Sequence, residues 1–179
     1  MLSCRKYRTD ASKRNDASKC YEGQNLVHLL KCIKREIELT RLTDTALPHK
    51  IWLKQQFSIG VNEVTRVLER MPPIDVKGSS PGHPLTTTRR FCCKASPVEI
   101  QAILVASDCS PQWLTRHLPS MASSRKVPLI VVTDKKGGSM RLGELVKLKT
   151  AIAIGVKVKG NAINRQIEEI LQGKLGRIV

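Results

Sequence analysis

Residues 58–71, SIGVNEVTRVLERM, combine polar side chains at a spacing that suggests a binding site. On a helix beginning near Val61, one face would carry Asn62, Glu63, Arg66 and Arg70. Asparagine and glutamate offer donors and acceptors to base edges, and arginine offers a bidentate donor to guanine or phosphate. Gly60, just before the helix, would let another backbone approach closely. These features indicate recognition of an anionic ligand with polar edges, such as nucleic acid.

A simpler interpretation of the same stretch is structural. Asn62 could cap the helix, because its side chain can accept a hydrogen bond from a free backbone N–H. Glu63 and Arg66 could form an ordinary surface ion pair one helical turn apart. Residue spacing alone leaves both interpretations open.

Other residues with reactive side chains form weaker patterns. Asp108 follows a predicted strand and His117 lies in a predicted helix, so a hydrolase using both is an alternative. His117 is better explained as a structural histidine. The segment KKGG after Thr133 lacks a Walker or dinucleotide-binding pattern. The six cysteines include no C-x-x-C pair, and a metal site from Cys92, Cys93 and His83 has little support. We therefore expect no cofactor, no metal and no enzyme activity.

Three apolar runs of strand length alternate with amphipathic segments that suit helices. The expected strands are residues 100–106, 127–133 and 150–156. The expected helices are residues 24–41, a short piece after Pro48, 61–70, 111–122, 141–147 and 161–172. Apolar strands alternating with helices imply a sheet covered on both faces. The sequence therefore predicts an α/β protein with a three-layer α/β/α sandwich.

The net charge of +16 at pH 7 favours a polyanionic partner, because solubility alone needs much less charge. Much of the excess lies outside the predicted core. We expect residues 1–20 to form a disordered basic arm, residues 21–156 a single RNA-binding domain, and residues 157–179 a C-terminal helix with a basic tail. Within the domain, residues 72–98 contain five prolines and two glycines and are interpreted as a long insertion. No apolar run is long enough to cross a bilayer, so no membrane partner is expected.

Four motifs in order resemble those of the kink-turn-binding ribosomal-protein superfamily. GVNEVTRVLER is similar to its G-x-N-E-x-T-K/R signature. The segments ILVASDCSPQWLTRHLPSM, RKVPLIVVTDK and RLGELVKLKTAIAIGV resemble the strands, helices and variable loop that follow. The resemblance covers roughly residues 50–156 and implies a small mixed sheet. Within the superfamily, QFSIGVNEVTRVLER and VKLKTAIAI are most similar to protein subunits of ribonuclease P and ribonuclease MRP.

The resemblance implies specific roles for the site residues. Asn62 and Glu63 would contact guanines of tandem sheared G·A pairs, and Arg66 would replace the lysine of the family. Gly60 would allow close approach, and Arg70 and Lys135 would hold the RNA backbone. Four residues would form the variable loop that packs on a flipped-out nucleotide: Val146, Lys147, Leu148 and Lys149.

Several positions depart from the pattern of the family. Ile59 stands where many relatives carry a base, and Ser110 stands where some carry glutamate. The 72–98 segment is longer than the usual connection. The expected function is that of a noncatalytic subunit binding structured RNA among other proteins, in the nucleus and in particular the nucleolus, with no small-molecule substrate. The alternatives are a small nucleolar or ribosomal kink-turn protein, or a protein-interaction module of the same fold.

Overall fold

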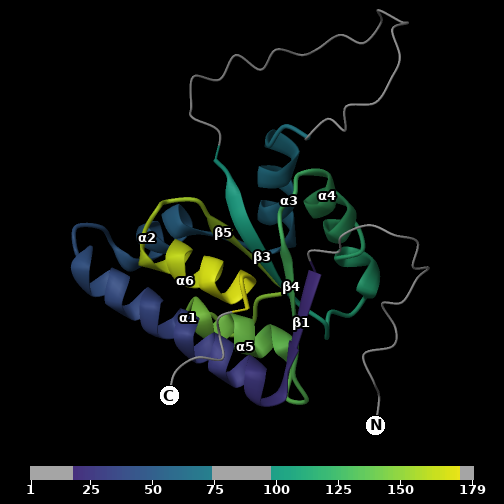
Figure 1. The fold of residues 1–179 in the computed structure, drawn as a ribbon, viewed down its shortest axis with the longest axis horizontal. Coiled ribbons are helices and arrows are strands. Elements are labelled where there is room, and N and C mark those ends of the chain that lie inside the picture. Colours follow the sequence, from purple (N-terminus) through teal and green to yellow (C-terminus); the bar gives the residue numbers. More distant parts are fainter. Residues whose placement is uncertain (1–17, 74–97, 174–179) are drawn as a thin grey trace, which may run out of the picture.

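A mixed β-sheet forms the middle layer of the protein (Figure 1). The computed structural model describes residues 18–73 and 98–173. The strands in these ranges are β1 (Ser18–Glu22), β2 (Phe57–Ile59), β3 (Ile100–Ala106), β4 (Leu129–Thr133) and β5 (Ala153–Lys157). Their order across the sheet is β1-β4-β3-β5-β2. β4 is parallel to both β1 and β3, whereas β5 is antiparallel to its neighbours β3 and β2.

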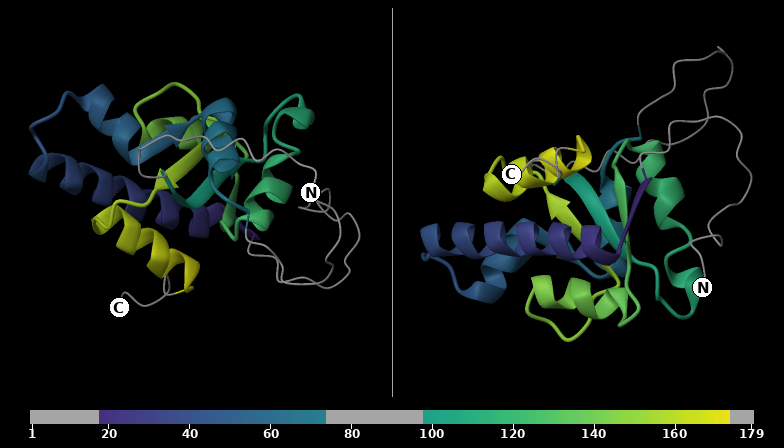
Figure 2. Two further views of the ribbon diagram at one scale, coloured as in Figure 1. Left: turned by 90° about the horizontal axis from the view of Figure 1, so that it is seen from above. Right: turned by 60° about the horizontal axis from the view of Figure 1, so that its bottom comes forward.

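Helices cover both faces of the sheet (Figure 2). The helices are α1 (Gly23–Thr43), α2 (His49–Gln56), α3 (Val61–Arg70), α4 (Leu118–Ser124), α5 (Gly138–Leu145) and α6 (Ala162–Leu171), with a short 3-10 helix η2 (Gln112–Leu114) before α4. One face packs against α1, α2, α5 and α6, and the other against α3 and α4. The predicted three-layer α/β/α sandwich with a small mixed sheet is confirmed.

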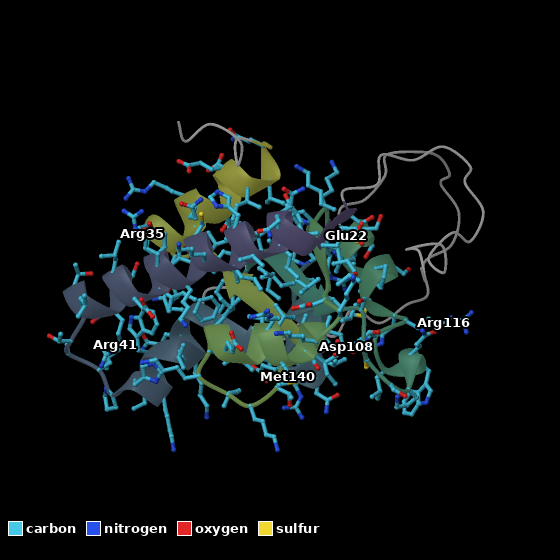
Figure 3. All side chains as sticks on the ribbon, turned by 90° about the horizontal axis from the view of Figure 1, so that it is seen from below. Glu22, Arg35, Arg41, Asp108, Arg116 and Met140 are labelled. Carbon is cyan, nitrogen blue, oxygen red and sulfur yellow. The ribbon has the colours of Figure 1, made fainter. Side chains whose placement is uncertain are left out.

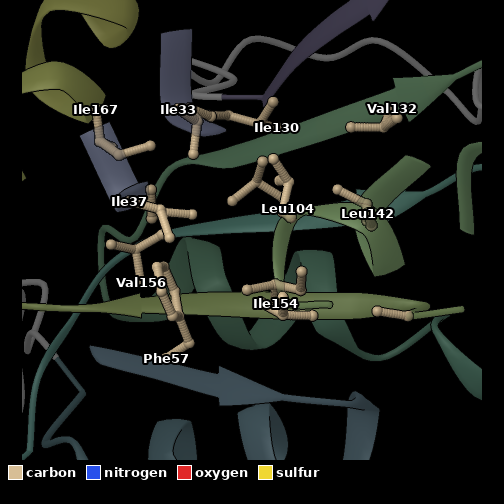
Figure 4. Close-up of a cluster of buried hydrophobic side chains, with 14 of the residues drawn as sticks. Ile33, Ile37, Phe57, Leu104, Ile130, Val132, Leu142, Ile154, Val156 and Ile167 are labelled. Atoms are coloured by element: carbon tan, nitrogen blue, oxygen red, sulfur yellow. The ribbon is translucent and has the colours of Figure 1, made fainter. Parts of the chain in front are cut away.

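Aliphatic side chains fill the larger of the two interfaces (Figure 4). Leu104, Ile130 and Ile154 come from three adjacent strands, and their side chains are at most 1% exposed. They pack with Ile33 of α1 and Ile167 of α6. Burial of such side chains stabilises the fold by roughly 1.5–3 kcal/mol each.

Two edge strands were not predicted. Ser18, Lys19 and Cys20 were assigned to the disordered arm, but they begin β1, which pairs with β4. The short helix expected after Pro48 ends at Gln56, and Phe57 begins β2, which pairs with β5. Each strand is short and has a single neighbour. The rest of the predicted arm and most of residues 72–98 lie outside the described ranges.

Helix α6, which was expected to follow the domain as a C-terminal helix, packs into its core. Ile163, Ile167 and Ile170 of α6 are buried against α1 and the sheet. Tyr21 in β1 also donates a hydrogen bond from its hydroxyl to the Ile170 carbonyl, at 3.4 Å. The C-terminal helix is therefore a structural part of the domain.

The helices around the third and fourth strands differ from the prediction. Residues 111–122 form η2 and then α4 rather than one helix, and His117 precedes α4 as its N-cap. Helix α5 begins at Gly138, which packs directly on the end of β4. This close packing requires glycine, because a Cβ at residue 138 would lie 2.6 Å from the Val132 carbonyl oxygen. Among the described helices, none combines the length and apolar character needed to span a membrane.

Candidate nucleic-acid interface

The predicted site residues gather at one edge of the sheet, here called the carboxyl edge. Strands β2, β3 and β4 all end there, and β5 begins there. Backbone hydrogen bonds join the connecting segments: Gly60 N–H donates to the Ala153 carbonyl at 2.8 Å, and Ala106 N–H donates to the Ile152 carbonyl at 2.8 Å. The start of α3 therefore lies next to the loop that leads into β5.

Helix α3 begins without a side-chain cap. Gly60 is the N-cap residue, with φ of 95°, and no side chain accepts a hydrogen bond from the first turn. The suggestion that Asn62 caps the helix is therefore wrong. No atom lies within 4 Å of a Cβ built on Gly60, so the space in front of this backbone is open. Free N–H groups and the positive end of the helix dipole favour an anionic ligand.

Asn62, Glu63 and Arg66 are all exposed. Glu63 and Arg66 do form the alternative ion pair, but their closest atoms are 4.0 Å apart and their side chains are 47% and 69% exposed. Exposed pairs of this kind stabilise a fold by about 0–1 kcal/mol. Both side chains are consequently available to a ligand.

Helix α3 runs from the carboxyl edge toward α4. The Met71 carbonyl at its end accepts a hydrogen bond from Arg125 Nε, at 3.1 Å. Arg70 is exposed on the last turn, seven residues beyond Glu63, which corresponds to about 10 Å along the helix axis. Arg70 can therefore contact a backbone that follows α3, but not the group bound by Glu63.

The predicted variable loop is only partly surface. Lys147, Leu148 and Lys149 are exposed, with Leu148 at 49%. Val146 differs from them: it is 2% exposed, and its side chain packs in the core rather than facing solvent. Its burial instead anchors the loop.

Gly143 in α5 fixes the position of this loop. The Gly143 carbonyl accepts hydrogen bonds from Val146 N–H at 3.1 Å and Leu148 N–H at 2.9 Å. A Cβ on Gly143 would lie 2.7 Å from the Leu148 carbonyl oxygen and 2.8 Å from Thr150 N. The loop backbone can reach this position only because residue 143 has no side chain.

Lys135 lies on the carboxyl edge but is distant from Gly60. It follows β4, and strands β3 and β5 separate β4 from β2. β4 and β2 are therefore three strand spacings apart, which corresponds to about 14 Å. Arg141 donates to Asp134 at 2.6 Å, and this hydrogen bond, with that from Lys136 N–H, lowers the pKa of Asp134. The turn after β4 exposes Lys135 to solvent. Only a ligand that extends along the carboxyl edge could contact both Lys135 and Glu63.

Arg41 extends the positive surface near the variable loop, and His49 lies close to it; neither residue was predicted. Burial lowers the pKa of His49, and the positive charges of Lys147 and Arg41 lower it further. The Arg41 guanidinium lies 6.0 Å from the Trp52 ring centroid and donates to the Asp44 carbonyl. The lowered pKa of His49 indicates that His49, Arg41 and Lys147 lie close together. No sequence pattern links these three positions, so the cluster could not be predicted.

Replacing Lys147 with alanine is expected to raise the pKa of His49 toward its ordinary value of about 6.5. Because folding lowers this pKa, protonation opposes folding, and the protein loses stability as the pH falls through 6.5 toward the folded pKa. An NMR titration of the His49 ring protons measures the shift. Lys149→Ala is the control, since it removes the same charge from the same exposed loop while Lys147, which lowers the pKa of His49, stays in place. If the His49 pKa shifts equally in Lys147→Ala and Lys149→Ala, Lys147 is not the lysine that lies close to His49.

Asp108 and His117 have separate structural partners. Asp108 accepts hydrogen bonds from Ser139 N–H at 2.9 Å and Ser139 Oγ at 2.8 Å, at the start of α5 (Figure 3). His117 Nε2 lies 2.8 Å from Thr65 Oγ1 of α3. These contacts account for both residues without catalysis. No cluster of three or more possible metal-ligating side chains occurs in the described residues, and His83, Cys92 and Cys93 lie outside them.

Comparison with known proteins identifies the fold. Residues 92–165 match the model of the ribosomal protein L7Ae/L30e/S12e/Gadd45 family. The match covers less than half of the chain, and it includes the variable loop but not α3. The structure is similar to that of the Giardia lamblia 15.5kD RNA binding protein, with a TM-score of 0.52 and 18% identity, covering 88% of this chain and 92% of that one.

A second similar structure is a protein of unknown function from Bacillus halodurans. Its TM-score is 0.45 and its identity 14%, covering 84% of this chain and 99% of that one. The family match and the Giardia structure together show that the protein has an L7Ae-like fold.

Proposed function

We propose that this protein is a noncatalytic RNA-binding subunit of a ribonucleoprotein, and that its carboxyl edge binds a kink-turn or related bent internal loop. One observation carries the proposal: the uncapped start of α3, with Asn62 and Glu63 exposed, is hydrogen-bonded through Gly60 to Ala153, at the end of the loop that carries the exposed residues Lys147–Lys149. The family match and the Giardia protein, which is described as RNA binding, support an RNA ligand.

The chemistry of the site suits a sheared G·A pair. Such a pair leaves guanine N–H donors unpaired, and the Glu63 carboxylate is a suitable acceptor. Asn62 can both donate and accept, and Arg66 can donate to guanine O6 or to phosphate. In the loop that leads into β5, the exposed side chain of Leu148 offers an apolar surface to an unstacked base. RNA recognition of this kind depends on shape and on exposed base edges.

A gel-shift titration tests this proposal directly. The protein is expected to bind a kink-turn RNA at least about tenfold more tightly than the same RNA with Watson–Crick pairs in place of its G·A pairs. Affinity for both RNAs should fall as salt rises, because lysine and arginine contacts to phosphate release counterions. Equal affinities for the two RNAs would contradict base recognition and favour a general electrostatic role or a protein ligand.

We further propose that the particle is ribonuclease MRP or ribonuclease P in the nucleolus. The long segment before the signature and the sequence VKLKTAIAI resemble the thirty-eight-kilodalton protein subunit of these enzymes. In such particles, which process precursor ribosomal or transfer RNA, the RNA performs the cleavage and the protein positions it. Sequencing the RNA that co-purifies with the tagged protein tests this, since small nucleolar or ribosomal RNA in its place would assign a different particle.

A further inference from the structure

Trp113 is unusual among the aromatic residues that the structure describes. Its side chain lies on η2 and is 69% exposed, whereas Trp52 is fully buried. Phe57 is also buried and Tyr21 is half-buried. Of the phenylalanine, tyrosine and tryptophan side chains in the described residues, that of Trp113 is the one classed as exposed. An exposed indole ring can bury a large apolar area against a ligand.

The backbone around Trp113 is held firmly in place. Cys109, Thr115 and Leu118 are buried on either side of it. Leu114 N–H donates to the Pro111 carbonyl at 3.2 Å, and Leu118 N–H donates to the Thr115 carbonyl at 3.1 Å. The turn therefore presents Trp113 from a fixed support, so that a ligand binding to the ring loses little backbone entropy.

The chain segment that carries Trp113, between Asp108 and Asp134, is basic. Arg116 is exposed close by, and Figure 3 shows it projecting from the turn, away from α5. The segment from Cys109 to Thr133 contains three lysine or arginine residues and no aspartate or glutamate. An aromatic ring in an acid-free, positive segment matches the composition of sites that hold single-stranded nucleic acid.

The position of the turn connects it to the proposed RNA site. The chain leaves the carboxyl edge at Asp108, forms η2, and reaches His117, whose Nε2 lies 2.8 Å from Thr65 Oγ1 on α3. Thr65 is adjacent to the exposed Arg66. A strand leaving an RNA bound at the start of α3 would pass Arg66 and then encounter this turn.

We propose that Trp113 stacks on an unpaired nucleobase of the bound RNA, and that Arg116 contacts the phosphate beside it. This inference rests on the proposed RNA-binding function and adds a subsite outside the kink-turn itself. The absence of acidic residues from Cys109 to Thr133 favours an RNA strand over a protein ligand.

The test compares two RNAs with the full-length protein: a kink-turn alone and the same kink-turn with an unpaired run of uridines on either strand end. For the extended RNA, Trp113→Ala is expected to weaken binding about tenfold, while Trp113→Phe keeps most of the affinity. Binding of the unextended RNA should be unchanged. Tryptophan fluorescence should be quenched by the extended RNA in the wild type and much less in Trp113→Phe, since Trp52 is buried.

Gln112→Ala is the matched control, since Gln112 is exposed on the same turn but has no ring. If wild type and Trp113→Ala bind the extended RNA equally, the stacking inference is overturned while the proposed function stands. If the wild type binds neither RNA, the proposed function itself fails. Loss of a co-purifying protein from Trp113→Ala, with RNA affinity unchanged, would assign the ring to a protein interface and also overturn the inference.

Discussion

Replacing Glu63 with alanine is expected to weaken binding of a kink-turn RNA by about 10- to 100-fold. The carboxylate is exposed on the first turn of α3, and its long contact with Arg66 does not engage it strongly. Its loss would leave guanine N–H groups without an acceptor in the complex, and an unpaired donor costs more than the hydrogen bond contributes. Gel shift or fluorescence anisotropy at fixed salt measures the change.

The direction of this effect distinguishes base recognition from charge. Removing an acid from a protein that binds a polyanion should by itself strengthen binding. Glu69→Ala supplies that comparison, because Glu69 is exposed on the same helix, six residues further on. We expect Glu69→Ala to bind equally well or slightly better. A parallel gain in Glu63→Ala would show that Glu63 does not contact the RNA.

Replacing Gly143 with alanine is expected to destabilise the protein by about 1–3 kcal/mol and to displace the variable loop. The new methyl group would meet the backbone of Leu148 and Thr150 at 2.7–2.8 Å, and a backbone cannot rotate away as a side chain can. The higher helix propensity of alanine, worth about 1 kcal/mol, offsets part of this cost. Urea unfolding measures the stability, and RNA affinity should fall because Lys147 and Lys149 move with the loop.

Glu144→Ala is the control for this prediction, since Glu144 neighbours Gly143 on α5 but is exposed. It should leave both the unfolding midpoint and RNA binding nearly unchanged. An unfolding midpoint for Gly143→Ala equal to that of the wild type would mean that the loop does not pack on α5 as described.

The sequence predicted the central strands and the main helices because these segments are buried on regular faces. Runs such as IQAILVA are apolar throughout, and the α1 side chains Leu26, Ile33 and Ile37 follow helical spacing. The strand SKCYE was missed because it is an edge strand with one neighbour. Its residues alternate between exposed and half-buried, so it lacks the apolar run of a central strand. The three residues of β2 are too few for any periodic pattern, and only pairing with β5 defines them.

The site was predictable where it lies on one helix and not where it depends on strand order. Helical spacing alone placed Asn62, Glu63 and Arg66 on one exposed surface. The distance of Lys135 from Gly60 could not be predicted, because strand order determines it. The resemblance to the family placed Val146 in the variable loop, and the turn after α5 directs its side chain into the core.

The pairing of β2 with β5 also sets the time at which the site can form during synthesis. Strand β2 directly precedes α3 and has β5 as its sole neighbour in the sheet, almost a hundred residues later in the chain. A ribosome needs on the order of 10 s to add that length. Until β5 has emerged, Gly60 lacks the strand whose Ala153 carbonyl accepts its hydrogen bond. A nascent chain that stops before β5 therefore carries the complete signature but has no assembled RNA site, which delays RNA binding until β5 has been synthesised.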